Sequence, residues 1–393
     1  MEKNDAIVIQ PAERTLQVQE YYFSRKLQQI DEMRRNGADV INLGIGSPDL
    51  PPSDEVTETL YQEALNPKNH GYQSYIGIPE LRAAFARWYT QYFRVTLDPA
   101  GEILPLIGSK EGIMHITMAF VNEGEEVLIP NPGYPAYESV ARLVGAKVRH
   151  YDLTGSQGWL PDLEKLEAEG VEKVKLMWVN YPHMPTGTPA SAELFSRLVT
   201  FARKNRILLC NDNPYSFILN TDTRSILETE GSRDVALELN SLSKSQNMAG
   251  WRIGMLAGRA DYIKTVLRVK SNMDSGMFRP LQSAAVKALE AGPEWYASVN
   301  EVYMKRRRFA EKIMDMLGCE FDSRQTGLFL WGRIPESYTN VEELTEKVLQ
   351  NAHVFITPGF IFGSNGDRYI RISLCSSEAL LRNAMERIKK MLA

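Results

Sequence analysis

The stretch SLSKSQNMAGWRIG, residues 241–254, carries the strongest single clue to the fold. One lysine, Lys244, stands among small hydroxyl residues, and Arg252 follows eight positions later between Gly250 and Gly254. A lone lysine in a serine-rich turn is most often a surface residue. A buried lysine, however, can form an imine with an aldehyde cofactor when its surroundings lower its pKa. Small neighbours would leave room for a ring, and the arginine would suit a phosphate group.

An apolar run ends in a carboxylate at RILLCNDNPY, residues 206–215. Asp212 closes the run, and Tyr215 follows three residues later. Ligands collect at the carboxyl ends of strands in a parallel sheet, and a carboxylate there can keep a pyridine nitrogen protonated. The alternative is an aspartate that caps a turn, which is common after strands.

Two further motifs follow apolar runs nearer to the N-terminus. GSKEG (108–112) opens a predicted helix, where free backbone N–H groups bind phosphate well. NPGYPAY (131–137) predicts a rigid loop from which Tyr134 could lie against a flat cofactor. The alternatives are an ordinary strand-to-helix turn and a turn with aromatic packing.

Two motifs lie further along the chain. YPHMPTG (181–187) again follows an apolar run and contains two prolines and a glycine. YIRISLC (369–375) places Arg371 inside an apolar strand, where an inward arginine needs a partner. Its planar guanidinium matches a carboxylate through two parallel hydrogen bonds. The alternative is an edge-strand arginine that faces solvent.

The order of elements predicts the fold class. Between about 100 and 260, apolar strands alternate with helices, which favours crossover units and a mostly parallel sheet covered on both faces. After about 290, a long polar helix and shorter strands predict a smaller α+β unit. We expect residues 1–49 to belong with this small domain, 50–290 to form the large domain and 291–393 the small domain. The remaining expectations are a helix over 15–36, a short strand within 39–46, and strands at 103–107, 125–130, 146–153, 173–180, 206–212 and 254–258.

Composition bounds the partners and the location. The chain carries 45 basic and 49 acidic side chains without a long block of either sign, which argues against a nucleic-acid or membrane-surface partner. Its cysteines and five histidines are dispersed, so their spacing predicts no metal site. Apolar runs stay well below the roughly 18 residues of a membrane span, and the N-terminal segment lacks the apolar core of a signal peptide. We therefore expect a cytoplasmic protein.

Taken together and in this order, the motifs resemble those of the class I/II aminotransferases of pyridoxal-phosphate (PLP) fold type I. The resemblance runs from Asn42 to Arg371. It implies a large domain, with a mostly parallel mixed sheet between helices, and a smaller α+β domain. LGIGSPDLPPS and LIGSKEG look most like the diaminopimelate and alanine-type aminotransferases. The motifs in family order are LGIGSPD (43–49), GYQSYIGIPELR (71–82), LIGSKEG (106–112), PNPGYPAY (130–137), PTG (185–187), DNPY (212–215), SLSK…GWRIG (241–254) and RISLC (371–375).

The resemblance implies a role for each candidate residue. Lys244 would be the Schiff-base lysine that moves a proton, Asp212 would pair with the pyridinium nitrogen, and Tyr215 would donate to the ring 3′-oxygen. Arg371 would bind the substrate α-carboxylate, with Gly46 nearby. The remaining implied cofactor contacts are Tyr134 on the ring, Gly108, Ser109, Lys110, Ser241 and Arg252 at the phosphate, and Tyr72 reaching the phosphate from the partner subunit of a homodimer.

The implied activity is transfer of an amino group between an L-amino acid and a 2-oxo acid by a ping-pong mechanism. Another PLP enzyme on the same fold, such as a carbon–sulfur lyase or a decarboxylase, is the alternative. A PLP-sensing transcription regulator is a remote one, because it would need an added DNA-binding module. The amino donor, the acceptor and the pathway stay open.

One position departs from the family pattern. The family usually has N-P-T-G, with the asparagine bonded to the ring 3′-oxygen, whereas this chain has Met184 in HMPTG. A thioether cannot donate a hydrogen bond. Either Asn180, His183 or water substitutes, or the oxygen relies on Tyr215.

Overall fold

The computed structural model describes residues 9–16 and 22–393, and its centre is a seven-stranded sheet in the order β2-β8-β7-β6-β5-β3-β4. Strands β7, β6, β5, β3 and β4 are parallel, and β8 runs antiparallel to both β7 and β2. The mostly parallel mixed sheet is therefore confirmed. The strands are β2 (Ile103–Leu106), β3 (Glu126–Asn131), β4 (Lys147–Asp152), β5 (Val174–Val179), β6 (Leu208–Asp212), β7 (Ala236–Ser241) and β8 (Gly254–Gly258).

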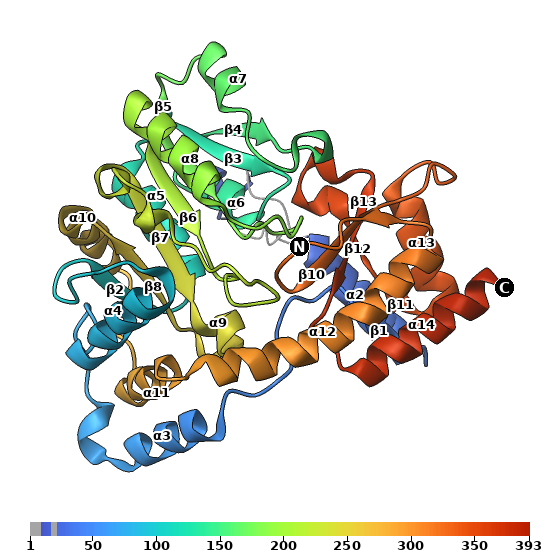
Figure 1. The fold of residues 1–393 in the computed structure, drawn as a ribbon, viewed down its shortest axis with the longest axis horizontal. Helices are drawn as coiled ribbons and strands as arrows, with labels where there is room; N and C mark the ends of the chain where they lie inside the picture. Colours follow the sequence, from blue (N-terminus) through green and yellow to red (C-terminus); the bar gives the residue numbers. More distant parts are fainter. Residues whose placement is uncertain (1–8, 17–21) are drawn as a thin grey trace, which may run out of the picture.

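Successive residues of the inner strands enter different cores, as strand geometry requires. In β3, Leu128 packs into one core, whereas Val127 and Ile129 pack into the other. A sheet that is apolar on both faces must be covered on both, and helices lie on each side of it (Figure 1). The first face is covered by α4 (Pro79–Phe93), α8 (Ala192–Asn205) and α11 (Arg279–Leu289), the last of which packs against α3 (Asp54–Leu65), and the second face by α5 (Ser109–Phe120), α6 (Ala136–Leu143) and α10 (Ala260–Lys270).

A second, antiparallel sheet of four strands has the order β12-β13-β10-β9. Near it, strand β1 pairs in parallel with β11, so residues 41–42 lie beside residues 354–355 from the C-terminal part of the chain. These elements are β1 (Ile41–Asn42), β9 (Glu320–Phe321), β10 (Phe329–Arg333), β11 (Val354–Phe355), β12 (Thr357–Pro358), β13 (Tyr369–Ser373), α2 (Tyr22–Arg35), α13 (Val341–Ala352) and α14 (Glu378–Leu392).

The long helix α12 (Pro293–Met316) connects the two parts of the molecule. Tyr296, in its first turn, packs into the core of the large sheet, whereas Val299 and Tyr303 pack into the core around the small sheet. Figure 1 shows α12 running from the large sheet to the group of elements at the C-terminus. The two parts are thus coupled through one continuous helix.

Three local expectations differ from the structure. Of the helix expected over 15–36, α2 covers Tyr22–Arg35, residues 17–21 lie outside the described part, and α1 (Glu13–Leu16) precedes them. The strand expected within 39–46 is only the two residues of β1. Strand β7 was not predicted, because Glu238 interrupts its apolar pattern. The remaining α-helices are the short α7 (Leu163–Ala168) and α9 (Leu242–Ser245).

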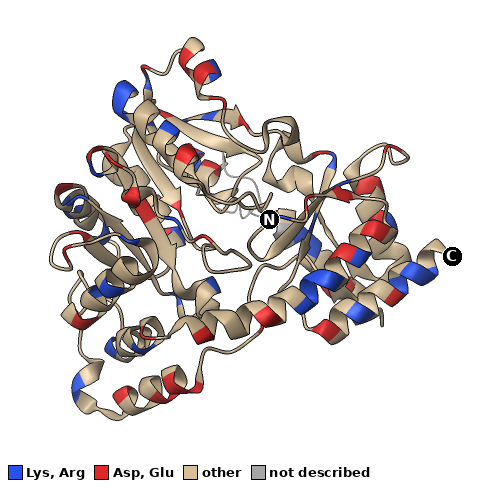
Figure 2. Ribbon diagram, viewed as in Figure 1, with Lys and Arg blue, Asp and Glu red and all other residues tan. Residues whose placement is uncertain are grey.

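Charges of both signs are interspersed along the helices, as Figure 2 shows for α12, α13 and α14. Of the helices that the structure describes, none has both the length and the apolar character needed to cross a membrane.

Candidate active site

The sequence motifs converge on one edge of the large sheet. Asn180 follows β5, Asp212 ends β6 and Ser241 ends β7, so all three lie at the carboxyl ends of parallel strands. Strand β2 points the same way and delivers residues 108–110 to this edge. Because β8 is antiparallel, it begins at this edge, two residues after Arg252. Ligand sites of open α/β sheets lie in this position.

A cavity of about 500 Å³ opens at this edge, and both sheets contribute to its wall. Most of the predicted site residues line it, whereas Gly108 and Tyr72 do not. The predicted residues that line the cavity are Gly46, Ser109, Lys110, Tyr134, Asp212, Tyr215, Ser241, Lys244, Arg252 and Arg371.

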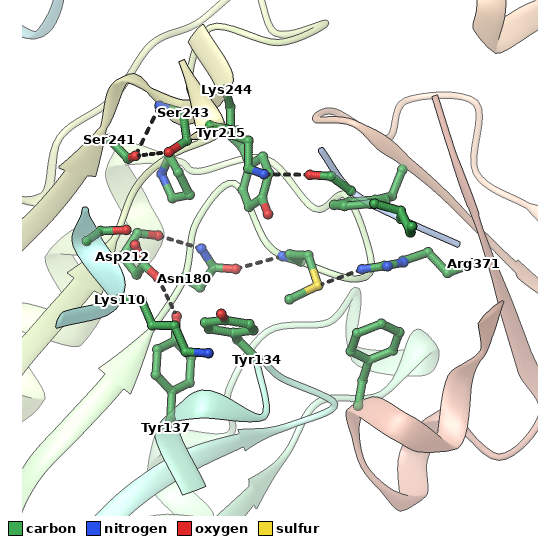
Figure 3. A pocket seen from close by; sticks show the side chains of 18 of the residues that line it. Lys110, Tyr134, Tyr137, Asn180, Asp212, Tyr215, Ser241, Ser243, Lys244 and Arg371 are labelled. Atoms are coloured by element: carbon green, nitrogen blue, oxygen red, sulfur yellow. Dashed lines mark hydrogen bonds between the residues drawn. The ribbon is translucent and has the colours of Figure 1, made fainter. Parts of the chain in front are cut away.

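Lys244 lies in α9, directly after β7, and its amine enters the cavity (Figure 3). The Ser241 side chain caps the start of α9. The Lys244 Nζ donates a hydrogen bond to the Gly46 carbonyl oxygen at 2.5 Å. Burial lowers the pKa of Lys244, and the nearby charges of Arg371 and Arg252 also lower it. A lowered pKa raises the share of neutral amine, which is the nucleophilic form.

Asp212 presents one satisfied and one unsatisfied carboxylate oxygen. Its Oδ2 accepts a hydrogen bond from the Tyr137 hydroxyl at 3.0 Å. Its Oδ1 is buried and has no hydrogen-bond partner among the described residues. Burial raises the pKa of Asp212 from 3.8 to about 6, although Tyr137 and Lys244 act in the opposite direction. A buried acceptor on a cavity wall requires a donor, and a protonated pyridine nitrogen supplies one.

Donor groups gather where α5 begins. Ser109 and Lys110 open this 12-residue helix, and Gly108 precedes them as its N-cap. Gly108 has a φ of +86°, and a Cβ there would lie 2.2 Å from Nη2 of Arg252. Glycine therefore lets the guanidinium lie against the start of the helix. A helix N-terminus beside an arginine fits a phosphate group.

Arg371 lies on β13, an inner strand of the small sheet, and is 4% exposed. The solvent-facing edge arginine is therefore ruled out. Its guanidinium carbon lies 3.9 Å from the centroid of the Phe329 ring and 4.5 Å from that of Phe362. Its Nη2 donates to the Gly44 carbonyl oxygen at 2.8 Å. The two rings hold the guanidinium plane in one orientation, which planar recognition of a carboxylate requires.

Met184, which replaces the family asparagine, contacts Arg371. Its Sδ lies 3.3 Å from Nη1 of Arg371, and its N–H donates to Asn180 Oδ1 at 2.8 Å. The Asn180 Nδ2 donates to the main-chain oxygen of Asp212, so a run of hydrogen bonds connects Asp212 with Arg371 (Figure 3). Asn180 thus lines the cavity with both ends of its amide engaged, whereas His183 does not line it.

Tyr137 is a cavity residue that the sequence did not single out. It holds Asp212, and its ring stacks on Trp178 with centroids 5.0 Å apart and planes 4° apart. It also lies edge to face with Tyr134 at 5.6 Å. Its position in NPGYPAY, three residues after Tyr134, could have indicated this, because a turn there brings the two residues together through the hydrogen bond from the Tyr137 N–H to the Tyr134 carbonyl oxygen at 3.1 Å. Further lining residues that were not singled out are Leu27, Gly44, Ile45, Pro214, Ser243, Ala249, Phe329 and Phe362.

Two predicted tyrosines occupy contrasting positions. Tyr215 lines the cavity, and burial raises the pKa of its hydroxyl. Tyr72 is 93% exposed and lies outside the cavity of its own chain. Its expected role in the site of a partner subunit stays a prediction.

A polar cluster lies apart from the cavity. Glu111 and His115 on α5 and Asp274 bring their potential ligand atoms within 4.8 Å of one another. Sequence spacing did not predict this grouping, because Asp274 is distant along the chain. The Lys270 Nζ lies 2.8 Å from Asp274 Oδ2 and donates to the Tyr75 carbonyl oxygen at 3.0 Å. The lysine already neutralises one carboxylate of the cluster.

Comparisons with known proteins agree with this geometry. The family model for aminotransferase class I and II matches residues 38–388. The LL-diaminopimelate aminotransferase of Moorella thermoacetica is 40% identical over 386 residues, covering 98% of this chain and 99% of the relative. That of Desulforudis audaxviator is 41% identical over 380 residues, covering 96% and 97%.

Solved structures show the same similarity. Apo-BacF from Bacillus subtilis superposes with a TM-score of 0.93 at 36% identity, covering 98% of this chain and 99% of that one. An aminotransferase from Staphylococcus aureus gives a TM-score of 0.88 at 28% identity, covering 97% and 99%. With its sheet, its cavity and its sequence in agreement, the chain belongs to the class I and II aminotransferase family.

Proposed function

We propose that this aminotransferase binds pyridoxal 5′-phosphate in the cavity at the sheet edge and links it covalently to Lys244. One observation carries the proposal. The Lys244 amine, the unpartnered Asp212 Oδ1 and the Arg371 guanidinium line the same cavity. They are the groups needed to anchor an aldehyde, a ring nitrogen and a carboxylate.

The chain's own side chains would hold the cofactor. Asp212 would accept a hydrogen bond from the ring nitrogen, Tyr215 would donate to the 3′-oxygen, and Tyr134 would lie against the ring. The phosphate would rest on the start of α5 beside the arginine. The residues proposed for the phosphate are Gly108, Ser109, Lys110, Ser241 and Arg252, with Tyr72 from a partner subunit.

Bound PLP supplies a carbonyl carbon that condenses with amines and a ring that withdraws electrons. Lys244 then has two tasks. Its amine would hold the cofactor between turnovers, and once freed by a substrate amine the same Nζ would accept the proton from the substrate Cα and return it on the cofactor side. Burial supports this base role by favouring the neutral amine. Asp212 would contribute the negative charge that keeps the ring nitrogen protonated.

Arg371 would bind the α-carboxylate of the amino acid and, in the second half of the cycle, that of the 2-oxo acid. The Gly46 carbonyl accepts the bond from Lys244, so it marks the place where the substrate amine arrives. Because the amino acid and the 2-oxo acid would both bind through Arg371, they cannot bind at the same time. This supports a ping-pong sequence.

A half-reaction screen tests the proposal. The PLP-loaded protein should show the visible absorption band of the cofactor linked to lysine. Mixing it with one amino acid alone should abolish this band and release one equivalent of the corresponding 2-oxo acid. A second 2-oxo acid should restore the band. LL-diaminopimelate belongs in the screen as a candidate donor, because curated relatives carry its name. Release of ammonia or carbon dioxide instead would favour the lyase or decarboxylase alternative and overturn the proposal.

Three properties of the whole protein are also proposals. We propose a homodimer, supported by the exposure of Tyr72. We propose the division into 1–49 with 291–393 and 50–290, supported by the pairing of β1 with β11. We propose a cytoplasmic location, which the free, buried cysteines fit. Light scattering, limited proteolysis and cell fractionation test them in that order.

A further inference from the structure

The segment Gly44–Ile45–Gly46 runs past both groups that would anchor a substrate. The Arg371 Nη2 donates to the Gly44 carbonyl oxygen, and the Lys244 Nζ donates to the Gly46 carbonyl oxygen. In the proposed function, the α-carboxylate belongs at Arg371 and the α-amino group at Lys244. The substrate Cα would therefore lie alongside Ile45, the residue between the two glycines.

The side chain of Ile45 faces the cavity. A Cβ on Gly44 would lie 2.5 Å from Cε1 of Phe355, and a Cβ on Gly46 would lie 2.4 Å from Cζ of Phe329. The side-chain directions of both glycines thus point into packed rings. Ile45 lines the cavity and is 44% exposed, so its side chain is accessible to a ligand.

The neighbouring wall is apolar as well. Leu27 on α2 lines the cavity with Ile45, and Met184, Phe329 and Phe362 line it around Arg371. These apolar side chains belong to the same cavity wall as Arg371 and Lys244, so a substrate bound between the two groups would contact them.

Charged groups in the cavity are already assigned to other tasks. Within residues 9–16 and 22–393, Asp212 is the one carboxylate among the lining residues. Its Oδ2 is bonded to Tyr137, and its Oδ1 is the proposed partner of the ring nitrogen. Lys110 and Arg252 lie at the proposed phosphate position. A second ammonium group on a donor would meet no further carboxylate among this chain's described lining residues, and an unpaired charge is costly to desolvate.

We propose that Ile45 and Leu27, with the rings flanking Arg371, form an apolar subsite that selects L-amino acid donors with apolar or aromatic side chains over donors with charged ones. The inference rests on the proposed function and narrows its substrate class. LL-diaminopimelate carries both an ammonium group and a carboxylate at its far end, so the subsite disfavours it.

Single-turnover kinetics of the PLP-loaded full chain test this selection. The experiment measures how fast each donor abolishes the visible absorption band of the cofactor. Three apolar donors (L-leucine, L-methionine and L-phenylalanine) are compared with three charged ones (L-aspartate, L-lysine and LL-diaminopimelate). We expect the best apolar donor to exceed each charged donor by about 100-fold or more in the ratio of maximal rate to dissociation constant.

A charge placed on the wall gives a second readout. Ile45→Glu should shift the preference from L-leucine towards L-lysine by at least about tenfold, because it supplies the missing carboxylate. Met304→Glu is the matched control, since Met304 is 50% exposed on α12 and does not line the cavity. This control should leave the preference unchanged.

The outcomes separate the two proposals. If LL-diaminopimelate, L-lysine or L-aspartate reacts as well as the apolar donors, the inference is overturned and the proposed function stands. An unchanged leucine-to-lysine preference in folded Ile45→Glu also overturns the inference. If no amino acid abolishes the visible absorption band of the cofactor, both the proposed function and this inference fail.

Discussion

Among single residues, Arg371 offers the most direct functional prediction. Arg371→Lys keeps the charge but loses the planar fork that Phe329 and Phe362 hold in place. Loss of a charge-assisted hydrogen bond costs about 1.5–3 kcal/mol. We therefore expect kcat/KM for amino acids to fall about 10- to 150-fold. Steady-state kinetics measure this, with a primary amine that lacks a carboxylate as the control substrate. Equal loss for both substrates would contradict carboxylate recognition.

Asp212 predicts a pH dependence in the cofactor-free protein. Its pKa is about 6 in the folded chain and 3.8 ordinarily, and burial is the main cause. Because the folded value is raised, the group's contribution to stability is fully present below about pH 3.8 and is lost as pH rises through about 6. Ionised Asp212 should therefore cost up to about 3 kcal/mol at pH 8.

Asp212→Asn removes this ionisation while an amide oxygen can still accept from Tyr137. Urea unfolding of the cofactor-free proteins should show the variant gaining stability over the parent above pH 6. The difference in the free energy of unfolding between the variant and the parent should shrink towards pH 4. A gap that does not change with pH would show that Asp212 does not ionise in this range.

Residue identity was easier to predict than residue environment. Asp212 and Arg371 stood out because each is a charged side chain beside or inside an apolar strand. The bond from Tyr137 to Asp212 was not predictable in the same way, because its partners meet only when α6 packs against the sheet. The raised pKa of Asp212 depends on the same packing, which the local sequence does not contain.

At the scale of elements, the start of α5 can be tested with a matched pair of glycines. Gly108→Ala forces a side chain into left-handed backbone and against Arg252. Moving the arginine away should weaken PLP binding about tenfold or more. Gly124 has a similar φ of +80°, but a Cβ there would meet nothing within 4 Å.

Gly124→Ala should therefore cost stability without changing the PLP dissociation constant. Fluorescence titration of both cofactor-free variants measures the difference. Equal weakening by the two substitutions would show that backbone strain alone, and not the approach of Arg252, controls binding.

Strand β7 shows where element prediction failed. Glu238 sits in the middle of the strand and is completely buried. It accepts hydrogen bonds from Tyr89, Ser225, Asn211 and the main-chain N–H of Ile226, which offset its desolvation. Burial raises its pKa. These donors all lie outside the strand, between 12 and 149 residues away in the sequence, so the local pattern predicts an exposed glutamate. By contrast, the continuous apolar runs of β3, β5 and β6 were predictable.

For the whole molecule, the proposed homodimer makes Tyr72 a residue of the neighbouring site. Mixing Lys244→Ala with Tyr72→Phe subunits yields hybrids that carry one site with both defects and one with neither. After random exchange of equal amounts, about half of the dimers are hybrids, so about a quarter of all active sites in the mixture should be free of both defects. Activity at limiting PLP should therefore exceed that of either variant alone.

Mass spectrometry of the mixture verifies that exchange has occurred. Verified hybrids whose activity only averages the two variants would show that Tyr72 serves its own chain. The sequence could suggest this arrangement only through family resemblance, because assembly depends on surfaces that no local pattern describes.

Covalent labelling of Lys244 tests the central claim most directly. Borohydride reduction of the PLP-loaded protein should fix the cofactor to one lysine, and peptide mapping should find it on the segment that contains Lys244. Lys110 is the built-in comparison, because it lines the same cavity. Lys244→Ala should bind PLP without becoming labelled there and should lose nearly all turnover. A label on Lys110, or no label on any lysine, would contradict the assignment.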